Sequence, residues 1–537
     1  MIKRLAASVT FAFLFTTGAV TAQSVPDFTR PMGEGPPEVE VLVSAVDAIS
    51  SMHMESFSDS LLWEGAIDGL IEALDDPYAE LFTPQDAEEW EEDTTGNYSG
   101  IGLQITLLND EITVTAVFRG FPASEHGLAV GDVIVGVNAY DATDWDTGMA
   151  ADTIRGPVGT SVEVHIKRLG YEQPITYDIT RAAVHVPAVT WGILEEDIGY
   201  VIMDRVARNA AREMNEALAE LEGRKGLIID LRRNPGGFLN ESLMLADLFL
   251  PTGSTLASTV QRAPGGSAET PETESYGDRW PQLVPDLPIV ILVDEFTASG
   301  AEILAGALQD YDRAIVLGQR TFGKGVVQTV MDLPYGRKLR FTTGSWLTPL
   351  GRSLQRPRDR QMVPLEEDLD NAPRIQSGEG RELINAGGVF PDLEIQDDTL
   401  KTTEQDFIRA SNEAQFPLGL RIAEAGLATA TVRRAANEGP GITDSEFEDF
   451  LTSLVDEGLE GSLLESDDVN AYLRWRMHMS TAQRMDDIAV EARFRAERDP
   501  VLTEAIQLLL NAQSQSDLIQ AVDAAPGATQ APGSGGR

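Results

Sequence analysis

Two residues near the middle of the chain, Ser299 and Lys324, have the types and settings that acyl-transfer chemistry needs. Ser299 follows an apolar run at 289–294 and precedes helical spacing at 302–308, so it is predicted at a strand-to-helix junction. Backbone N–H groups at a helix start have no partner within the helix and can stabilise a negatively charged oxygen. Ser299 could therefore act as a nucleophile beside an oxyanion hole. The structural alternative is that Ser299 only caps the helix.

Lys324 is the better candidate for the base. It lies in Phe322-Gly-Lys-Gly-Val-Val327, an apolar setting that disfavours the ammonium form and lowers the pKa of a lysine. A Ser-Lys pair is a known variant of the catalytic triad. The alternative is a solvated lysine beside two glycines. None of the histidines falls near Ser299 in sequence; they are His53, His126, His165, His185 and His478.

A second glycine-containing turn follows another predicted strand. Asp230-Leu-Arg-Arg-Asn-Pro-Gly-Gly237 ends in Gly236 and Gly237, which permit a close approach of the backbone to a ligand. Either glycine could donate a second oxyanion hydrogen bond, and a plain tight turn is the alternative.

The elements that must position these residues form an alternating pattern. From Ile198 to about Ile395, strand and helix patterns alternate, as expected for an α/β core with a largely parallel sheet. The runs at 226–231 and 289–294 are typical of buried strands. Residues 262–279 lack aliphatic periodicity and are predicted to form an exposed loop.

The chain before this core is predicted to contain four segments. Residues 1–22 carry Lys3 and Arg4, an apolar run and a small-residue cleavage pattern, which indicate a signal peptide. Residues 23–39 are a Pro- and Gly-rich linker, and residues 40–95 are helical. Residues 96–183 switch to short strands and turns. Within the helical segment, a single buried face is predicted from Leu62, Ala66, Leu70, Ile71 and Leu74.

The predicted core spans residues 184–400. After it, residues 401–522 are predicted to form an acidic helical extension, and residues 523–537 are predicted to form a disordered tail. The apolar positions of the extension could pack within the chain or against another subunit. They include Leu451, Leu454, Leu459, Leu463 and Leu464.

Composition limits the function classes. The net charge is −45, with 86 acidic against 41 basic residues, and such a field disfavours binding to nucleic acid or to anionic membranes. The chain has no cysteine, which excludes thiol catalysis. Export without disulfides points to a bacterial periplasm or cell envelope. No cluster has metal-ligand spacing, so neither a metal nor an organic cofactor is expected.

From about Leu61 to Ile395, a series of motifs resembles the carboxyl-terminal processing, or tail-specific, serine proteases. In the family's order these are GAIDGLIEALDDPYAELFTPQDAEEW, YSGIGLQI, FPASEHGLAVGDVIVGVN, IRGPVGTSVEVHIKR, LIIDLRRNPGG, FTASGAEILAGALQDY, TFGKGVVQ, FTTGSWLTPLGRSLQ and GVFPDLEI. The resemblance implies a multidomain α+β protein. Its domains would be an N-terminal helical segment, a PDZ-like β domain, an α/β protease core and a C-terminal helical extension.

The resemblance implies roles for individual residues. Ser299 would be the nucleophile, Lys324 the general base and Gln328 the residue that orients the lysine. In a strand, Lys324 and Gln328 would project from the same face. Asp310 matches an acidic position implicated in other members, although on a helix it could be structural.

The backbone N–H groups of Gly300 and of Gly236 or Gly237 would form the oxyanion hole. The run Ala298-Ser-Gly-Ala-Glu302 departs from the family's usual Ser-Ala-Ser-Glu. The segment 352–388 exceeds the shortest family versions, and its role is open.

The PDZ-like domain implies recognition of protein C-termini by strand addition. Gly100, Ile101, Gly102 and Leu103 fit the carboxylate-binding loop, with Ile101 and Leu103 lining an apolar pocket. Arg155 is a candidate for coupling the PDZ domain to the protease core, and a solvated turn is the alternative.

The resulting hypothesis is an exported serine endopeptidase that binds apolar C-terminal tails and cleaves them through an acyl-enzyme. The competing hypotheses are a catalytically silent PDZ scaffold and a structural envelope protein. The need for an adaptor lipoprotein and the formation of a homo-oligomer are left open.

Overall fold

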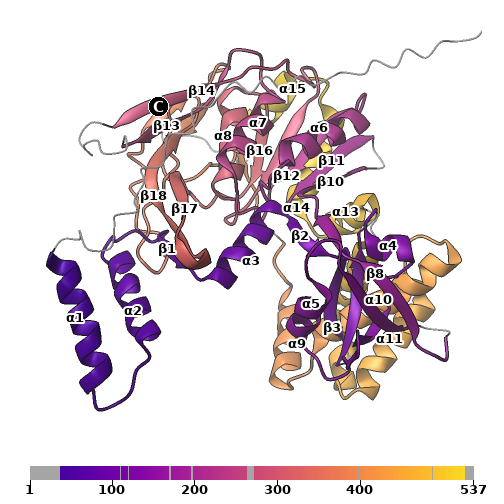
Figure 1. Ribbon diagram of the computed structural model, residues 1–537. Helices are drawn as coiled ribbons and strands as arrows, with labels where there is room; N and C mark the ends of the chain where they lie inside the picture. The colour runs from indigo at the N-terminus through magenta and orange to yellow at the C-terminus, as the bar shows by residue number, and fades with distance from the viewer. Residues whose placement is uncertain are drawn as a thin grey trace, which may run out of the picture. The chain divides into compact units, whose positions relative to one another are not determined.

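The computed structural model describes residues 37–108, 110–118, 120–168, 171–194, 197–262, 271–396, 398–485 and 488–525 (Figure 1). The predicted signal peptide, most of the predicted linker and most of the predicted tail lie outside the described residues. The chain divides into two compact units, Met1–Asp75 with Arg262–Pro271, and Asp76–Gln261 with Glu272–Arg537.

The first unit contains the helices α1 (Pro37–Met52) and α2 (Asp59–Glu72). Ser58 caps α2 by accepting a hydrogen bond from the N–H of Leu61. The helix is where its spacing predicts, but the predicted buried face is wrong, since no residue of α2 is buried and Leu70 is 64% exposed. Among the described residues of this unit, α2 packs against α1, and a pair of helices is too small to enclose an apolar face.

The second unit begins with a short strand and a helix, β1 (Glu80–Phe82) and α3 (Pro84–Thr95). Thr83 and Asp86 form a reciprocal capping box, Pro84 occupies the first turn, and Gly96 ends the helix in the left-handed conformation at φ 69°.

The PDZ domain is a small sheet with two helices. Its main sheet has the order β3-β4-β5-β7-β8, and β6 pairs with β5. The antiparallel pair β2–β9 lies where the chain enters and leaves it. The elements are β2 (Asn97–Gly100), β3 (Leu103–Leu108), β4 (Glu111–Val117), α4 (Pro122–His126), β5 (Val133–Val137), β6 (Tyr140–Asp141), α5 (Thr147–Ile154), β7 (Ser161–Lys167), β8 (Ile175–Thr180) and β9 (Ala182–His185).

The α/β core is built on a sheet of order β10-β11-β12-β15-β16-β21, parallel from β11 onward. Its strands are β10 (Val189–Ile193), β11 (Ile198–Met203), β12 (Gly226–Asp230), β15 (Ile289–Val293), β16 (Ile315–Gly318) and β21 (Leu393–Glu394). Every residue of β12 and β15 is buried, which confirms the two predicted buried strands.

Helices cover both faces of this sheet. Leu227 and Ile229 point to the cluster that contains α6 (Ala210–Glu220), α7 (Leu239–Asp247) and α8 (Gly300–Asp310). Ile228 points to the opposite cluster, which contains α13 (Ile488–Ala496), α14 (Pro500–Asn511) and α15 (Gln515–Asp523). Figure 1 shows the yellow helix α14 beside β12. The end of the predicted helical extension therefore completes the protease core.

A second sheet has the order β1-β18-β13-β14, and β17 also pairs with β18. Its further strands are β13 (Thr255–Gln261), β14 (Glu272–Gly277), β17 (Val326–Asp332) and β18 (Lys338–Leu347). The predicted loop at 262–279 is wrong for its second half, because β14 pairs antiparallel with β13. This edge strand is mostly exposed. Backbone hydrogen bonds rather than buried apolar side chains hold it in the sheet, so its sequence shows no alternation of apolar residues.

The remaining elements are short segments around the core and helices after it. They are η1 (Pro334–Gly336), β19 (Arg374–Gln376), β20 (Glu382–Ile384), α9 (Thr402–Glu413), α10 (Leu418–Ala436), α11 (Asp444–Asp456), η2 (Gly461–Leu464) and α12 (Asp467–Met485). Leu454 and Leu459 are buried with Phe447 and Tyr472 in a cluster inside the chain, so these leucines pack intramolecularly. None of the helices in the described ranges has the length and hydrophobicity of a membrane span.

If α14 completes the core, truncating its buried face should destabilise the fold. Leu502 is fully buried against the sheet, so we expect Leu502→Ala to lower the free energy of unfolding by about 2–5 kcal/mol in chemical denaturation. Leu510, on the same helix but 39% exposed, is the matched control, and Leu510→Ala should change it by less than about 1 kcal/mol. Equal effects of the two variants would contradict the packing described.

Candidate active site

A cleft of about 1410 Å³ in the second unit brings the predicted site residues together. Residues from the PDZ domain and from the protease core line it. They include Ser299, Gly300, Lys324, Gln328, Gly236, Gly237, Gly100, Ile101, Gly102, Leu103 and Arg155. Within the described chain no histidine lines this cleft, and no three His, Asp or Glu side chains gather as a metal ion would require.

Ser299 occupies a strained turn between β15 and α8. Asp294, at the end of the strand, accepts hydrogen bonds from the N–H and the hydroxyl of Thr297 at 2.9 and 3.0 Å and from the N–H of Arg233 at 2.9 Å. Ser299 then has φ 52° and ψ −115°, a conformation that costs a non-glycine residue about 1–3 kcal/mol. A strained strand–turn–helix position exposes a nucleophile at the top of a sheet.

Glycines pack directly against this turn. A Cβ atom on Gly236, which has φ 89°, would lie 2.6 Å from the nitrogen of Gly300 and 2.7 Å from the Cβ of Ser299. A Cβ on Gly237 would overlap the carbonyl of Val206. Side chains are therefore excluded at both positions, and the backbone of 236–237 reaches the turn of Ser299. The N–H of Gly236 donates to Asn234 Oδ1 at 2.8 Å and is therefore already engaged.

Glu302 joins the turn of Ser299 to the loop of Lys324. Its carboxylate is fully buried and accepts four hydrogen bonds, from the N–H groups of Ser299, Gly323 and Lys324, each at 2.8 Å, and from the hydroxyl of Thr321 at 2.5 Å. Burial raises the pKa of Glu302, and these hydrogen bonds oppose that shift. Sequence reasoning did not assign Glu302 a role. The sequence feature that could have identified Glu302 is the Ser-x-x-Glu spacing of a capping box.

The Lys324 side chain is partly buried. Burial and, to a smaller degree, the nearby positive charge of Arg340 lower its pKa to about 8, and Glu302 and Asp76 act in the opposite direction. The Nζ atom lies 5.3 Å from the centre of the Tyr78 ring. The interpretation of a freely solvated lysine is therefore wrong, and the lowered pKa makes the neutral amine of Lys324 easier to form near neutral pH than that of an ordinary lysine.

Gln328 lines the same cleft as Lys324, although not through strand alternation. The strand β17 begins at Val326, after the lysine, and its pairing with β18 shifts register between Val327 and Gln328. Regular strand alternation therefore does not explain why Lys324 and Gln328 both line the cleft. The Gln328 side-chain amide donates to the carbonyl oxygen of Tyr78 at 3.0 Å.

The segment 352–388 packs on the loop that carries Lys324. Gln355 Oε1 accepts a hydrogen bond from the N–H of Gly325 at 2.8 Å, and the N–H of Arg356 donates to the carbonyl of Gly323 at 2.9 Å. A Cβ atom on Gly325 would lie 2.6 Å from the nitrogen of Gln355. Tight packing, rather than flexibility, therefore explains the glycines on either side of the lysine.

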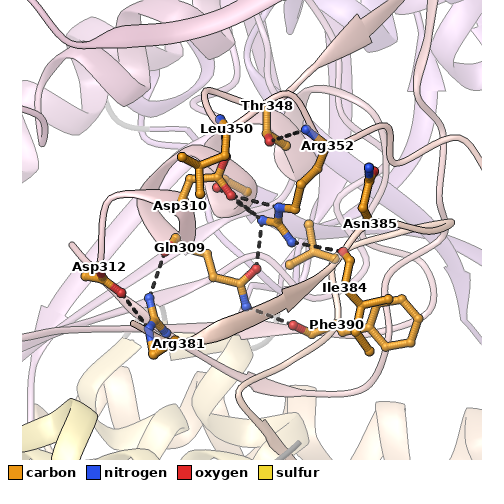
Figure 2. Close-up of polar contacts among 12 residues, drawn as sticks. Gln309, Asp310, Asp312, Thr348, Leu350, Arg352, Arg381, Ile384, Asn385 and Phe390 are labelled. Atoms are coloured by element: carbon orange, nitrogen blue, oxygen red, sulfur yellow. Dashed lines mark hydrogen bonds and ion pairs between the residues drawn. The ribbon is translucent and has the colours of Figure 1, made fainter. Parts of the chain in front are cut away.

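Asp310 lies at the other end of α8 from Ser299, roughly 16 Å along the helix axis. Figure 2 shows its contacts. Its side chain and that of Arg352 are fully buried and form an ion pair at 2.6 Å, and its Oδ2 accepts from the N–H of Leu350. Gln309 Oε1 also accepts from Arg352 at 2.9 Å. Asp310 therefore anchors the helix, and its loss would leave a buried guanidinium without its counter-charge.

The predicted carboxylate-binding loop of the PDZ domain has mixed accessibility. Ile101 is 1% exposed and belongs to the domain core, and Leu103 is partly buried against that core; both residues line the cleft. Gly102 has φ 85°, and a Cβ there would lie 2.5 Å from the Cβ of Phe121. Arg155 forms an ion pair with Glu92 of α3 at 2.9 Å.

Gly300 packs tightly against Ser242, a buried serine of the neighbouring helix α7. A Cβ atom at Gly300 would overlap Ser242 Oγ. We expect Gly300→Ala to lower the free energy of unfolding by about 1–3 kcal/mol through this overlap. Replacing the serine as well, in Gly300→Ala/Ser242→Ala, should recover most of the loss in the same denaturation experiment. Simple addition of the two single effects would refute the overlap.

Three protein-family models match the chain. They are described as "Activating protease CtpB N-terminal domain" at residues 6–83, "PDZ domain" at 90–167 and "Peptidase family S41" at 197–361.

Relatives and a solved structure match over much of their length. A "Probable CtpA-like serine protease" of Staphylococcus epidermidis is 33% identical over 55% of this chain and 58% of that protein, so the match spans little more than half of that relative. A carboxy-terminal-processing protease of Bartonella bacilliformis is 30% identical over 66% of this chain and 81% of that protein. The structure of a photosystem II D1 C-terminal processing protease is 26% identical over 62% of this chain and 92% of the solved chain, and its TM-score of 0.33 is too low to support an argument.

The expected fold class is confirmed, with an N-terminal helical region, a PDZ domain, an α/β core and C-terminal helices. From the identity and coverage of these matches, the chain belongs to the carboxy-terminal processing proteases of peptidase family S41.

Proposed function

We propose that this protein is a serine endopeptidase that binds the C-terminal tails of other proteins through its PDZ domain and cleaves them with Ser299 and Lys324. The observation that carries this proposal is the buried Glu302 carboxylate, which accepts hydrogen bonds from the backbone of both residues. Family membership supports the reaction class.

In the proposed mechanism the neutral amine of Lys324 takes the proton of the Ser299 hydroxyl as its oxygen attacks the scissile carbonyl carbon. The resulting oxyanion accepts hydrogen bonds from the N–H groups of Gly300 and Gly237. The Lys324 ammonium then gives its proton to the leaving amine, and the acyl-enzyme forms. Water, deprotonated by the same amine, hydrolyses the ester and regenerates Ser299.

Gln328 has a proposed orienting role. Because its amide NH₂ group faces the Tyr78 carbonyl, its side-chain oxygen remains to accept a hydrogen bond from Lys324. Such a bond would point the amine toward Ser299 in both the neutral and the charged form.

Substrate would enter the cleft from the PDZ side. An extended peptide can add to the edge strand β3, opposite α5, because residues of both elements line the cleft. The backbone of Gly100, Gly102 and Leu103 would bind the terminal carboxylate. Arg155 is held to α3 by Glu92, so we propose that it couples the PDZ domain to that helix rather than directly to Ser299.

We also propose that the protein is exported to the periplasm or cell envelope of a bacterium. The positively charged and apolar pattern of residues 1–22 and the absence of cysteine from the sequence support this. An adaptor lipoprotein and a homo-oligomer remain open elements of the proposal.

Single substitutions test the Ser-Lys pair. We expect Ser299→Ala and Lys324→Ala each to reduce cleavage of an unstructured protein with an apolar C-terminus by more than about a thousandfold. Binding of the same tail, measured by fluorescence anisotropy, should persist in both variants. Wild-type protein that binds but does not cut would support the silent scaffold, and undiminished cleavage by either variant would rule out this mechanism.

The pH dependence tests the protonation state of the base. Because the reaction needs the neutral amine of Lys324, whose pKa is about 8, kcat/KM should rise with pH and level off above about pH 8. Below that pH it should fall about tenfold per pH unit, as the amine becomes protonated. A profile that is flat between pH 6 and 9 would contradict lysine as the base.

A further inference from the structure

A short segment that precedes the PDZ domain in sequence lies against the catalytic lysine. Asp76 Oδ2 accepts from the N–H of Thr342 at 2.9 Å, and Asp76 Oδ1 accepts from the hydroxyl of Thr342 at 3.2 Å. A few residues later, β1 pairs antiparallel with the same strand, β18. The segment 76–82 is thereby attached at both ends to the strand that also pairs with β17, the strand of Gln328.

Tyr78, between these two attachments, contacts the catalytic lysine loop in three ways. Its ring centre lies 5.3 Å from Lys324 Nζ, its carbonyl oxygen accepts from Gln328 Nε2 at 3.0 Å, and its hydroxyl lies 3.5 Å from Gln355 Nε2. Gln355 in turn accepts from the N–H of Gly325. Tyr78 is only 8% exposed, so these contacts hold the ring in a defined place.

An aromatic ring suits the neighbourhood of a lysine that must gain and lose a proton. Its face attracts an ammonium group but carries no formal charge. A carboxylate at the same distance would stabilise the ammonium strongly and hold the lysine protonated. The ring therefore favours the charge that develops on Lys324 during proton transfer while leaving the neutral amine accessible.

We propose that Tyr78 is a positioning residue, whose ring and carbonyl group together fix Lys324 and Gln328 for proton transfer from Ser299. This inference rests on the proposed Ser-Lys mechanism. It assigns to the segment before the PDZ domain a direct role in the protease site.

The other charged groups near Lys324 would be unchanged in a Tyr78 variant. They are Glu302 of α8, Arg340 of β18 and Asp76 of the same segment. Removing the ring while keeping a buried apolar side chain should therefore subtract mainly the attraction between ring and ammonium. The pKa of Lys324 would then fall, because its charged form loses stabilisation.

The test compares Tyr78→Phe with Tyr78→Leu in the full chain. Tyr78→Phe keeps the ring and should stay within about twofold of the wild type. Tyr78→Leu should lower kcat about tenfold with little change in KM, and move the midpoint of the pH–rate profile down by about half a unit to one unit. Tyr78→Met, with a flexible side chain that fills irregular space, repeats the test if the leucine variant does not fold.

The outcomes separate this inference from the mechanism on which it rests. A Tyr78→Leu protein that folds and keeps both kcat and the pH midpoint of the wild type would overturn the role of Tyr78. A lower thermal unfolding midpoint with an unchanged or higher pH midpoint would also overturn it, since that result indicates structural support alone. Cleavage by Lys324→Ala, measured in parallel, would instead overturn the Ser-Lys mechanism.

Discussion

The site depends on one buried carboxylate. Glu302 accepts hydrogen bonds from backbone groups on both sides of the cleft wall, those of Ser299 on one segment and of Gly323 and Lys324 on another. A side chain with acceptors only can satisfy several buried N–H donors at once, and leaving such donors unpaired would cost about 1–3 kcal/mol each. Glu302 thus holds the turn of Ser299 and the loop of Lys324 together. This constraint explains how a strained serine conformation at φ 52° can persist.

Around this centre, burial is the largest influence on the pKa of Lys324, ahead of the charges of its neighbours. Burial lowers the pKa of Lys324, which lies on a loop against which the segment around Gln355 packs. The negative charges of Glu302 and Asp76 oppose this, which keeps the pKa from falling further. The two influences leave the amine able to exchange a proton near neutral pH. Asp310, by contrast, acts through Arg352 at the far end of α8 and supports the helix whose first turn holds Ser299.

Elements with strong local signals were predictable from the sequence. The buried strands β12 and β15 lie where their apolar runs predict. Errors arose where pairing or packing partners come from elsewhere. The edge strand β14 carries no apolar period because β13 holds it by backbone hydrogen bonds. The apolar face of α2 has helical spacing, but none of its residues is buried.

For the site, the sequence alone identified Ser299 and Lys324 as the candidate pair. This was possible because the strand–turn–helix pattern around Ser299 and the apolar setting of Lys324 are local properties of the sequence. Only the tertiary structure decided what surrounds them. Tyr78 and Gln355 lie far from Lys324 in the chain, and Glu302 reaches the lysine loop only because β15, α8 and β16 bring the two segments together. Hydrogen bonds between distant segments leave no periodic trace in a sequence, because they depend on how strands are ordered in space. The proposal of Gly237 rather than Gly236 as oxyanion donor has the same origin, since the side chain of Asn234 already accepts a hydrogen bond from the N–H of Gly236.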